Sequence, residues 1–240
     1  MEKSESGSPI YRYQENDRNE FQAPSGEGNL EEISKHIEKY VGEVNMVFHE
    51  LISDQVHIDL HWIKPTSERP YHTLVTSGMS DKPMTTPYEM NGSRYAELSI
   101  CLPADWKISQ EDFEDEENYW PLRWLKILSR FPHEYNTWLG YGHTIPNGNP
   151  PAPFSNRTNL NTMVLLPSIL FDPEFHELKI NDEKTICFYT IYPLYTEEVD
   201  LKMKKGVDAL FDGFERIGLT DVLEINRENS VKRKKLFGLF

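Results

Sequence analysis

The chain has 240 residues, which is enough to bury a sizeable core as one large domain or two small ones. Its 39 acidic and 25 basic residues give a formal net charge of −14, which argues against a nucleic-acid-binding protein because such proteins carry basic surfaces. The same negative charge suits binding to a basic protein partner. For an acidic chain without other evidence, however, the more common explanation is that the charge only keeps the protein soluble. The first residues lack the apolar core of a signal peptide, and no apolar run is long enough to span a bilayer. We therefore expect a cytoplasmic protein that does not contact a membrane.

The first part of the chain is polar and then becomes periodic. Residues 1–28 are rich in Ser, Glu, Gly, Asn and Gln, which predicts a flexible or loosely packed arm. Asn29 and Glu32 have the pattern of a helix cap, and apolar residues at helical spacing predict a helix that Gly42 ends. His36 lies off the apolar stripe of this helix, and we expect it to be solvated.

The next segment shows the alternation that is typical of strands. Apolar residues occupy every second position over 56–62, which predicts a half-buried strand. A polar, proline-containing loop separates it from a second strand over 71–76, so a hairpin is expected. Residues 95–102 alternate again and predict a third strand, which Pro103 ends.

The centre of the chain contains the most apolar helix candidate and three of the five tryptophans. Pro121 suits the first helical position, and large apolar residues follow at helical spacing as far as Phe131. Such a helix must be covered on most sides. Pro132 is expected to end this helix or to begin a second one. Glycines and prolines over 136–148 then predict a long loop.

The last part of the chain alternates strand and helix signals. Residues 163–166 predict a short strand, and residues 186–192 are apolar or aromatic on both faces, which predicts a central strand closed by Pro193. Helices are predicted over 196–205 and 207–217. Strands come mostly in hairpins, without strict strand–helix–strand alternation. We therefore predict an α+β fold in which a mixed, largely antiparallel sheet is packed by helices.

A metal site is one catalytic possibility in this sequence. His57, Asp59 and His61 share one face of a predicted strand, so neighbouring members could hold one ion. His57 and His61 would be about 13 Å apart on an extended strand, which is too far for both to bind one zinc ion unless the strand bends. A solvated strand face is the favoured interpretation.

A cysteine nucleophile is the second catalytic possibility. Cys101 could act with His133 or His143, but Cys101 and Cys187 both lie in apolar strands. They are expected to be buried thiols without a disulfide. The sequence contains no phosphate-binding loop, no serine-hydrolase elbow and no zinc-protease motif. We therefore expect a protein that is not an enzyme and that needs no cofactor and no metal.

Three stretches of the chain resemble the suppressor of fused family. They are YHTLVTSGMSDKPM, RFPHEYNTWLGYGHTIPNG and FYTIYPLYTEEVDLKMKKGVDAL, at residues 71–84, 130–148 and 188–210. Their order and spacing fit the family, and the chain looks closest to the bacterial single-module members. The resemblance implies a suppressor-of-fused-like domain over 29–225, preceded by the arm over 1–28 and followed by a basic, apolar tail over 226–240.

The resemblance also implies a function in protein binding. Animal members of the family hold a transcription factor inactive by gripping an extended peptide, and bacterial members act as immunity proteins against toxins encoded beside them. We therefore expect an immunity protein, or antitoxin, that binds and neutralises a basic toxin such as a nuclease. One alternative is a regulatory adaptor that binds an extended peptide by strand addition. The other is a metal-dependent enzyme that uses His57, Asp59 and His61.

The expected partner-binding residues lie around the loop after the central helix, because aromatic residues on a rigid scaffold are common anchors of binding surfaces. In animal members the peptide-gripping groove lies near the counterpart of this segment. The resemblance therefore implies that this segment, but not a particular set of contacts, takes part in binding. Gly142 stands where those members have an acidic residue. The alternative is that Trp138 belongs to the core and that the polar residues bond to the loop's own backbone. The candidate residues are Phe131, Asn136, Trp138, Tyr141 and His143.

Overall fold

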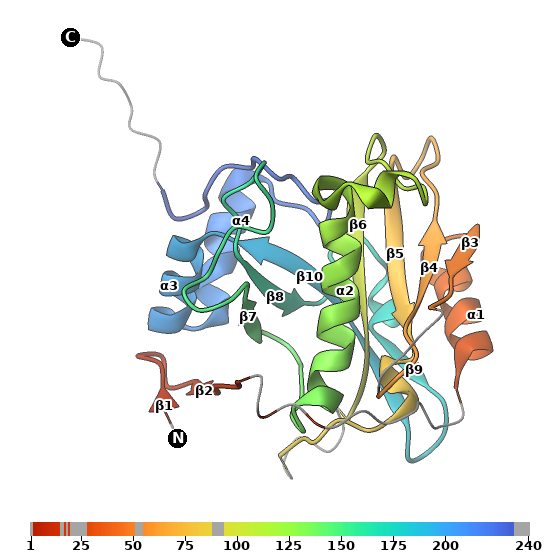
Figure 1. Cartoon of the computed structure of the whole chain (residues 1–240), viewed down its shortest axis with the longest axis horizontal. Coiled ribbons are helices and arrows are strands. Elements are labelled where there is room, and N and C mark those ends of the chain that lie inside the picture. The colour runs from red at the N-terminus through yellow and green to blue at the C-terminus, as the bar shows by residue number, and fades with distance from the viewer. Residues whose placement is uncertain are drawn as a thin grey trace.

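A computed structural model of the chain describes residues 2–14, 17, 19, 28–50, 55–87 and 94–232. Within these ranges, eight strands form one sheet in the order β3-β4-β5-β6-β10-β8-β7, with β9 also pairing with β10 (Figure 1). A separate pair of short strands lies in the N-terminal arm. The strands are β1 (Glu2–Lys3), β2 (Pro9–Ile10), β3 (Met46–Phe48), β4 (Asp59–Ile63), β5 (Tyr71–Ser77), β6 (Tyr95–Pro103), β7 (Thr144–Pro146), β8 (Thr162–Leu166), β9 (Glu177–Lys179) and β10 (Thr185–Leu194).

The sheet is mixed and largely antiparallel, as the sequence predicts. Strands β4 and β5 form the expected hairpin, with Asp59 opposite Ser77. Strand β10 lies in the interior of the sheet, parallel to β6 on one side and antiparallel to β8 on the other. Strands β3 and β7 are at the two ends of the strand order. The predicted α+β class and the central position of the strand that contains Cys187 are both confirmed.

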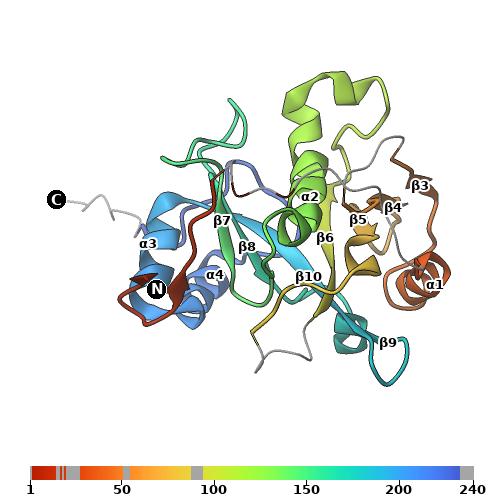
Figure 2. The same cartoon turned by 60° about the horizontal axis from the view of Figure 1, so that its bottom comes forward.

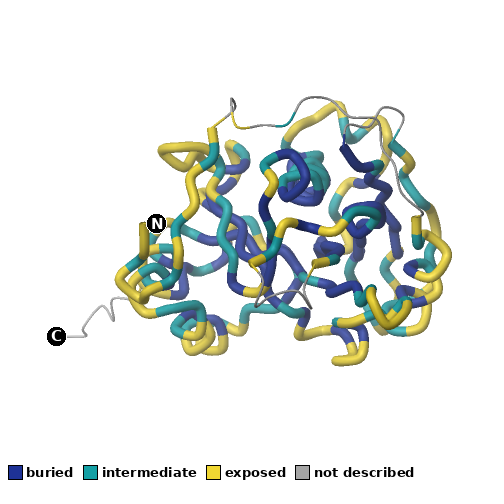
Figure 3. The backbone as a smooth tube through the Cα atoms, turned by 90° about the horizontal axis from the view of Figure 1, so that it is seen from below, coloured by how far each residue is buried: buried dark blue, intermediate teal, exposed yellow. Residues whose placement is uncertain are grey.

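Helices cover both faces of this sheet (Figure 2). Helix α2 (Glu116–Glu134) packs on one face and contributes to the largest core. On the other face, α1 (Leu30–Tyr40) packs with β5 and β10, while α4 (Phe211–Ile217), which follows α3 (Thr196–Lys205), packs with β8 and β10. The strands are buried between these layers, and exposed residues lie mainly in loops and on outer helix faces (Figure 3). Four short 3₁₀ helices complete the described elements: η2 (Met79–Asp81), η4 (Asp112–Glu114), η5 (Pro173–His176) and η6 (Val207–Leu210). No helix of the described ranges is long and apolar enough to cross a membrane.

Helix α2 is longer than the sequence predicts. It begins at Glu116, where the Asp115 carboxylate accepts a hydrogen bond from the Glu117 N–H (3.0 Å), and it runs through Pro121 and Pro132. The prediction that Pro132 ends the helix or begins a second one was therefore wrong. A proline inside a helix costs about 3 kcal/mol, but each large apolar side chain that the helix buries contributes about 1.5–3 kcal/mol. Packing outweighs the cost, since α2 buries Trp120, Leu122, Trp124, Leu125 and Leu128.

The structure corrects three further predictions, which concern burial and strand length. Strand β4 is buried along its whole length instead of on one face, because α1 covers the side opposite α2. His36 is buried rather than solvated: its ring stacks on Phe175 and Phe188, at centroid distances of 5.4 and 5.1 Å. Strand β10 does not end before Pro193 but continues through it to Leu194. The Pro193 carbonyl accepts a hydrogen bond from the Arg227 side chain.

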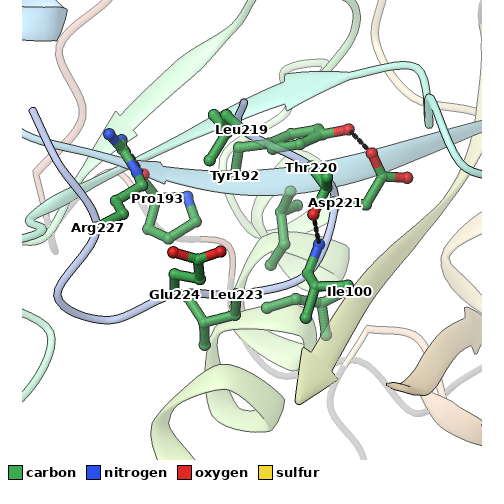
Figure 4. A pocket seen from close by; sticks show the side chains of 11 residues that line it. Ile100, Tyr192, Pro193, Leu219, Thr220, Asp221, Leu223, Glu224 and Arg227 are labelled. Carbon is green, nitrogen blue, oxygen red and sulfur yellow. Dashed lines mark hydrogen bonds between the residues drawn. The ribbon is translucent and has the colours of Figure 1, made fainter. Parts of the chain in front are cut away.

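The chain after α4 contacts both β6 and β10, and Val222 forms an isolated parallel bridge with Cys101 of β6. Leu223 donates its N–H to the carbonyl of Cys101 (2.9 Å), and Tyr192 donates its hydroxyl to Asp221 (Figure 4). Further on, Arg227 forms a buried two-bond ion pair with Glu198 of α3, at 2.6 and 2.5 Å. The described residues 226–232 are therefore packed on the domain, while residues 233–240 of the predicted tail lie outside the described ranges.

Candidate functional site

The segment that follows α2 is held firmly on two sides. Asn136, with φ +48°, lies just beyond the end of the helix. The Thr137 carbonyl then accepts a hydrogen bond from the Thr85 N–H (3.0 Å), and Gly142 donates its N–H to the carbonyl of Leu165 in β8 (2.8 Å). The predicted loop is thus a fixed backbone between residues 84–85 and β8, which suits the presentation of side chains to a partner.

Trp138 and His143 form the inner part of this segment. Trp138 packs against the core under α2, and its ring contacts the His143 ring at a centroid distance of 4.3 Å. Gly140 allows this arrangement, since a Cβ there would lie 2.9 Å from the Trp138 ring. Burial, with a smaller contribution from Lys202, lowers the pKa of His143 to about 4, so the ring is neutral at pH 7. The core interpretation of Trp138 is therefore the better one.

Tyr141 forms the outer part of the segment. Its side chain is 47% exposed, and its hydroxyl donates to the Asp208 carboxylate of η6 (3.1 Å). Asp208 is exposed, as are Phe211 and Asp212, which follow three and four residues later and so lie on the same side of the helix. We call these four residues the Tyr141 surface. Sequence reasoning missed its three members from η6 and α4, because only the contact between the loop and η6 brings them to Tyr141.

Phe131 and Asn136 contact the chain's own N-terminal arm, although Asn136 itself stays exposed. The Tyr13 ring meets Phe131 edge-on at a centroid distance of 5.3 Å, and its hydroxyl bonds to Thr137 Oγ1 (2.5 Å). Asn136 donates its side-chain amide to Asn19 Oδ1 (2.8 Å), and Asn19 donates to the His133 carbonyl (2.6 Å). The five predicted residues therefore divide into a pair that contacts the arm, an inner pair, and Tyr141, which contacts η6. No local sequence signal marks Tyr13 or Asn19 as their neighbours.

The predicted histidine set is only partly assembled. His57 Nε2 lies 2.9 Å from Asp59 Oδ1, but His61 is fully buried and bonds to Ser77 Oγ (3.0 Å). Burial lowers the pKa of His61 to about 4. The second histidine beside Asp59 is not His61 but His49, whose Nδ1 lies 3.0 Å from Asp59 Oδ2. The structure therefore does not bring His57, Asp59 and His61 together as one set, because α1 covers His61 while His49 approaches Asp59 from the end of β3.

The two cysteines are buried free thiols, as predicted. Cys101 lies 3.7 Å from Thr73 Oγ1 in the core, and burial raises the pKa of its thiol. A raised pKa disfavours the thiolate that a nucleophile needs. His133, one of its suggested partners, instead bonds to the Met79 carbonyl (2.9 Å). The described residues therefore do not join Cys101 to a catalytic base.

Neither of two cavities in the described part of the chain has the features of a typical small-molecule site. The first lies between β10 and the segment after α4 (Figure 4) and has a volume of ≈ 10 Å³, about the space that one water molecule needs. The second is an open groove of ≈ 500 Å³ beside the start of α3. Its lining is mostly polar, which is unlike the apolar lining of typical small-molecule sites. It consists of Pro153, Asn159, Asn161, Tyr195, Thr196, Glu197, Asn229 and Lys232.

Comparison with known sequences identifies a family. The family model described as "Suppressor of fused protein (SUFU)" matches residues 54–228, which is more than half of the chain. A relative, the uncharacterized protein UU111 of Ureaplasma parvum serovar 3, is 27% identical over 145 residues. This match covers 60% of the present chain and 67% of the relative.

Comparison with solved structures agrees. A protein described as a SUFU homolog from Neisseria gonorrhoeae FA 1090 has a TM-score of 0.59 at 16% identity, covering 85% of this chain and 97% of that one. A chain of the Sufu–Fu complex gives 0.57 at 17% identity, covering 86% and 93%. Drosophila Suppressor of Fused gives 0.56 at 14% identity over 85% of this chain, which spans about half of that longer protein (50%). These likenesses establish a shared fold, and with the family match they show that the chain belongs to the suppressor of fused family.

Proposed function

We propose that this chain is a non-enzymatic protein-binding module, and specifically a bacterial immunity protein that binds and neutralises a basic toxin such as a nuclease. Family membership and the likeness to a chain of the Sufu–Fu protein complex support the binding role. The observation that carries the proposal is the Tyr141 surface. It places an exposed aromatic side chain beside carboxylates on a backbone that β8 and residues 84–85 hold in place.

The chemistry of the Tyr141 surface fits a basic protein. Tyr141 and Phe211 are 47% and 38% exposed and offer apolar anchors of the kind that dominate binding energy. Asp208 and Asp212 are exposed beside them and attract Lys and Arg side chains of a partner. The net charge of −14 adds a long-range field of the same sign, which speeds encounter with a basic partner and weakens as salt increases.

Co-expression tests the immunity role. The toxin encoded beside the gene for this chain would be expressed alone, with the wild-type chain, and with the Tyr141→Ala variant. We expect the wild type to restore growth and Tyr141→Ala to protect less at equal protein level. Met46→Ala is the matched control, because Met46 is also 47% exposed but lies on β3, at the other end of the strand order from β7. Failure of the wild-type chain to protect against any neighbouring toxin would refute the immunity role.

An adaptor that binds an extended peptide by strand addition is the second candidate. Strand β3 is an end strand of the sheet, and Met46 on it is exposed, so its outer edge offers backbone groups to an added strand. The strand is only three residues long, which limits the number of hydrogen bonds that a peptide gains there. Binding of a linear fragment of the partner with the affinity of the folded partner would favour this candidate over the first.

A further inference from the structure

We propose that His49, His57 and Asp59 form a binding site for a divalent transition-metal cation such as Zn²⁺. Each side chain offers one ligand atom, and the three atoms lie within 4.8 Å of one another. His49 directly follows β3, while His57 and Asp59 lead into the neighbouring strand β4. The pairing of these two strands thus brings together residues that are eight and ten positions apart in the sequence.

The distances are close to those of a zinc site. Zinc bonds to His and Asp are about 2.0–2.2 Å long, so ligand atoms of a tetrahedral site lie about 3.3–3.5 Å apart. His49 Nδ1 and His57 Nε2 lie 3.0 and 2.9 Å from the two oxygens of Asp59. Each histidine faces a different oxygen of Asp59, and the three ligand atoms lie within 4.8 Å of one another, so small side-chain movements would bring them to the spacing of a zinc site. Two imidazoles with one carboxylate are donors that favour zinc and its neighbours in the periodic table over Mg²⁺ or Ca²⁺.

The carboxylate of the site is buried and held in place, whereas its two histidines are open to solvent. The Asp59 side chain is only 8% exposed, and its Oδ1 accepts a hydrogen bond from the Glu50 N–H (3.3 Å). The His49 and His57 side chains are 60% and 40% exposed, so an ion can enter from solvent. Three protein ligands leave a fourth position for water or for a side chain of another molecule. A bound ion would tie the segment after β3 to β4, independently of the Tyr141 surface and of the proposed immunity role.

Metal titration of the full chain tests the site. The chain would be purified with a chelator, dialysed and titrated with Zn²⁺ by calorimetry and with Co²⁺ by visible absorption. We expect one ion per chain and the intense visible bands of a low-coordinate cobalt site. His49→Gln and Asp59→Asn should each weaken zinc binding by more than about 100-fold. The reason is that loss of a residue that only hydrogen-bonds to a metal ligand already weakens binding by about 10–100-fold. His176→Gln is the control, because His176 of η5 bonds to the Ser168 carbonyl and lies outside the cluster.

A second measurement, the melting temperature with and without Zn²⁺, separates loss of metal binding from loss of the fold. Zn²⁺ should raise the melting temperature of the wild type and of His176→Gln in a concentration-dependent way, and should leave that of His49→Gln unchanged. The side chain of His49 is mostly exposed, so its variant should have the wild-type melting temperature without metal. Absence of zinc binding by the wild type, or binding that survives both His49→Gln and Asp59→Asn, would overturn the proposal.

Discussion

Glu97 gives the most quantitative prediction, because a fully buried carboxyl group links stability to pH. It lies on β6 and accepts hydrogen bonds from the hydroxyls of Thr76 and Ser80 (both 2.6 Å) and from the N–H groups of Gly78 (3.0 Å) and Ser80 (2.9 Å). These bonds favour the charged form, but burial outweighs them and raises the pKa of Glu97 from 4.5 to about 7.

The sign follows from comparing the folded and unfolded states. Below pH 4.5 the Glu97 carboxyl is protonated in both states, and the stability that it contributes is fully present. As the pH rises, the unfolded chain ionises first, so this stability is lost progressively until the folded pKa of about 7 has been passed. At about 1.4 kcal/mol for each pH unit between the two pKa values, the loss amounts to about 3 kcal/mol.

Glu97→Gln isolates this effect. The amide resembles the protonated carboxyl: its oxygen accepts from Gly78 and Ser80, and its N–H₂ faces Thr76. The free energy of unfolding would be measured in urea at pH 5 and pH 8 for both chains at equal salt. We expect similar stabilities at pH 5 and a variant more stable than wild type by about 3 kcal/mol at pH 8.

The control makes the same chemical change at an exposed position. Glu215 lies on the solvent side of α4. The free energy of unfolding of Glu215→Gln should therefore differ from that of the wild type by the same amount at pH 5 and at pH 8. If the difference between wild type and Glu97→Gln were also the same at pH 5 and pH 8, burial would not control this carboxyl and the reasoning would be refuted.

Three further predictions concern the fold. Arg227→Ala leaves the carboxylate of Glu198 buried without its ion-pair partner and should lower the free energy of unfolding by about 3–5 kcal/mol in urea titrations; an unchanged value would show that the pair is solvated. Gly78→Ala should lose more than about 3 kcal/mol, because φ is +106° and a Cβ would lie 1.8 Å from the His57 carbonyl oxygen. Gly218→Ala, at φ +66° with open space around it, should lose only about 1 kcal/mol by the same measurement; equal losses at the two glycines would contradict the role of the clash.

The elements of the fold are largely predictable because their signals are local. Alternation over 56–62 and 71–76 gives the β4–β5 hairpin, and helical spacing gives α1 and α2. The errors arise where a distant segment decides the outcome. The burial of His36 depends on Phe175 and Phe188, which are far from it in sequence.

The candidate site is less predictable for the same reason. The five predicted residues share one stretch, but their exposure depends on segments at both ends of the chain. Tyr13 covers Phe131 from the N-terminal arm, and Asp208 meets Tyr141 from η6. Likewise, strand alternation correctly groups His57 with Asp59, but it carries no information about the approach of His49 from β3.

The most direct test of the account is the affinity of the chain for its partner, once capture from the native host has identified that partner. Calorimetry would compare the wild type, Tyr141→Ala and Met46→Ala, each at low and high salt. The account predicts a complex with a basic protein that weakens with salt, a loss of about tenfold or more in affinity for Tyr141→Ala, and wild-type affinity for Met46→Ala. Equal affinity of wild type and Tyr141→Ala, or capture of no protein partner, would contradict a binding function centred on the Tyr141 surface.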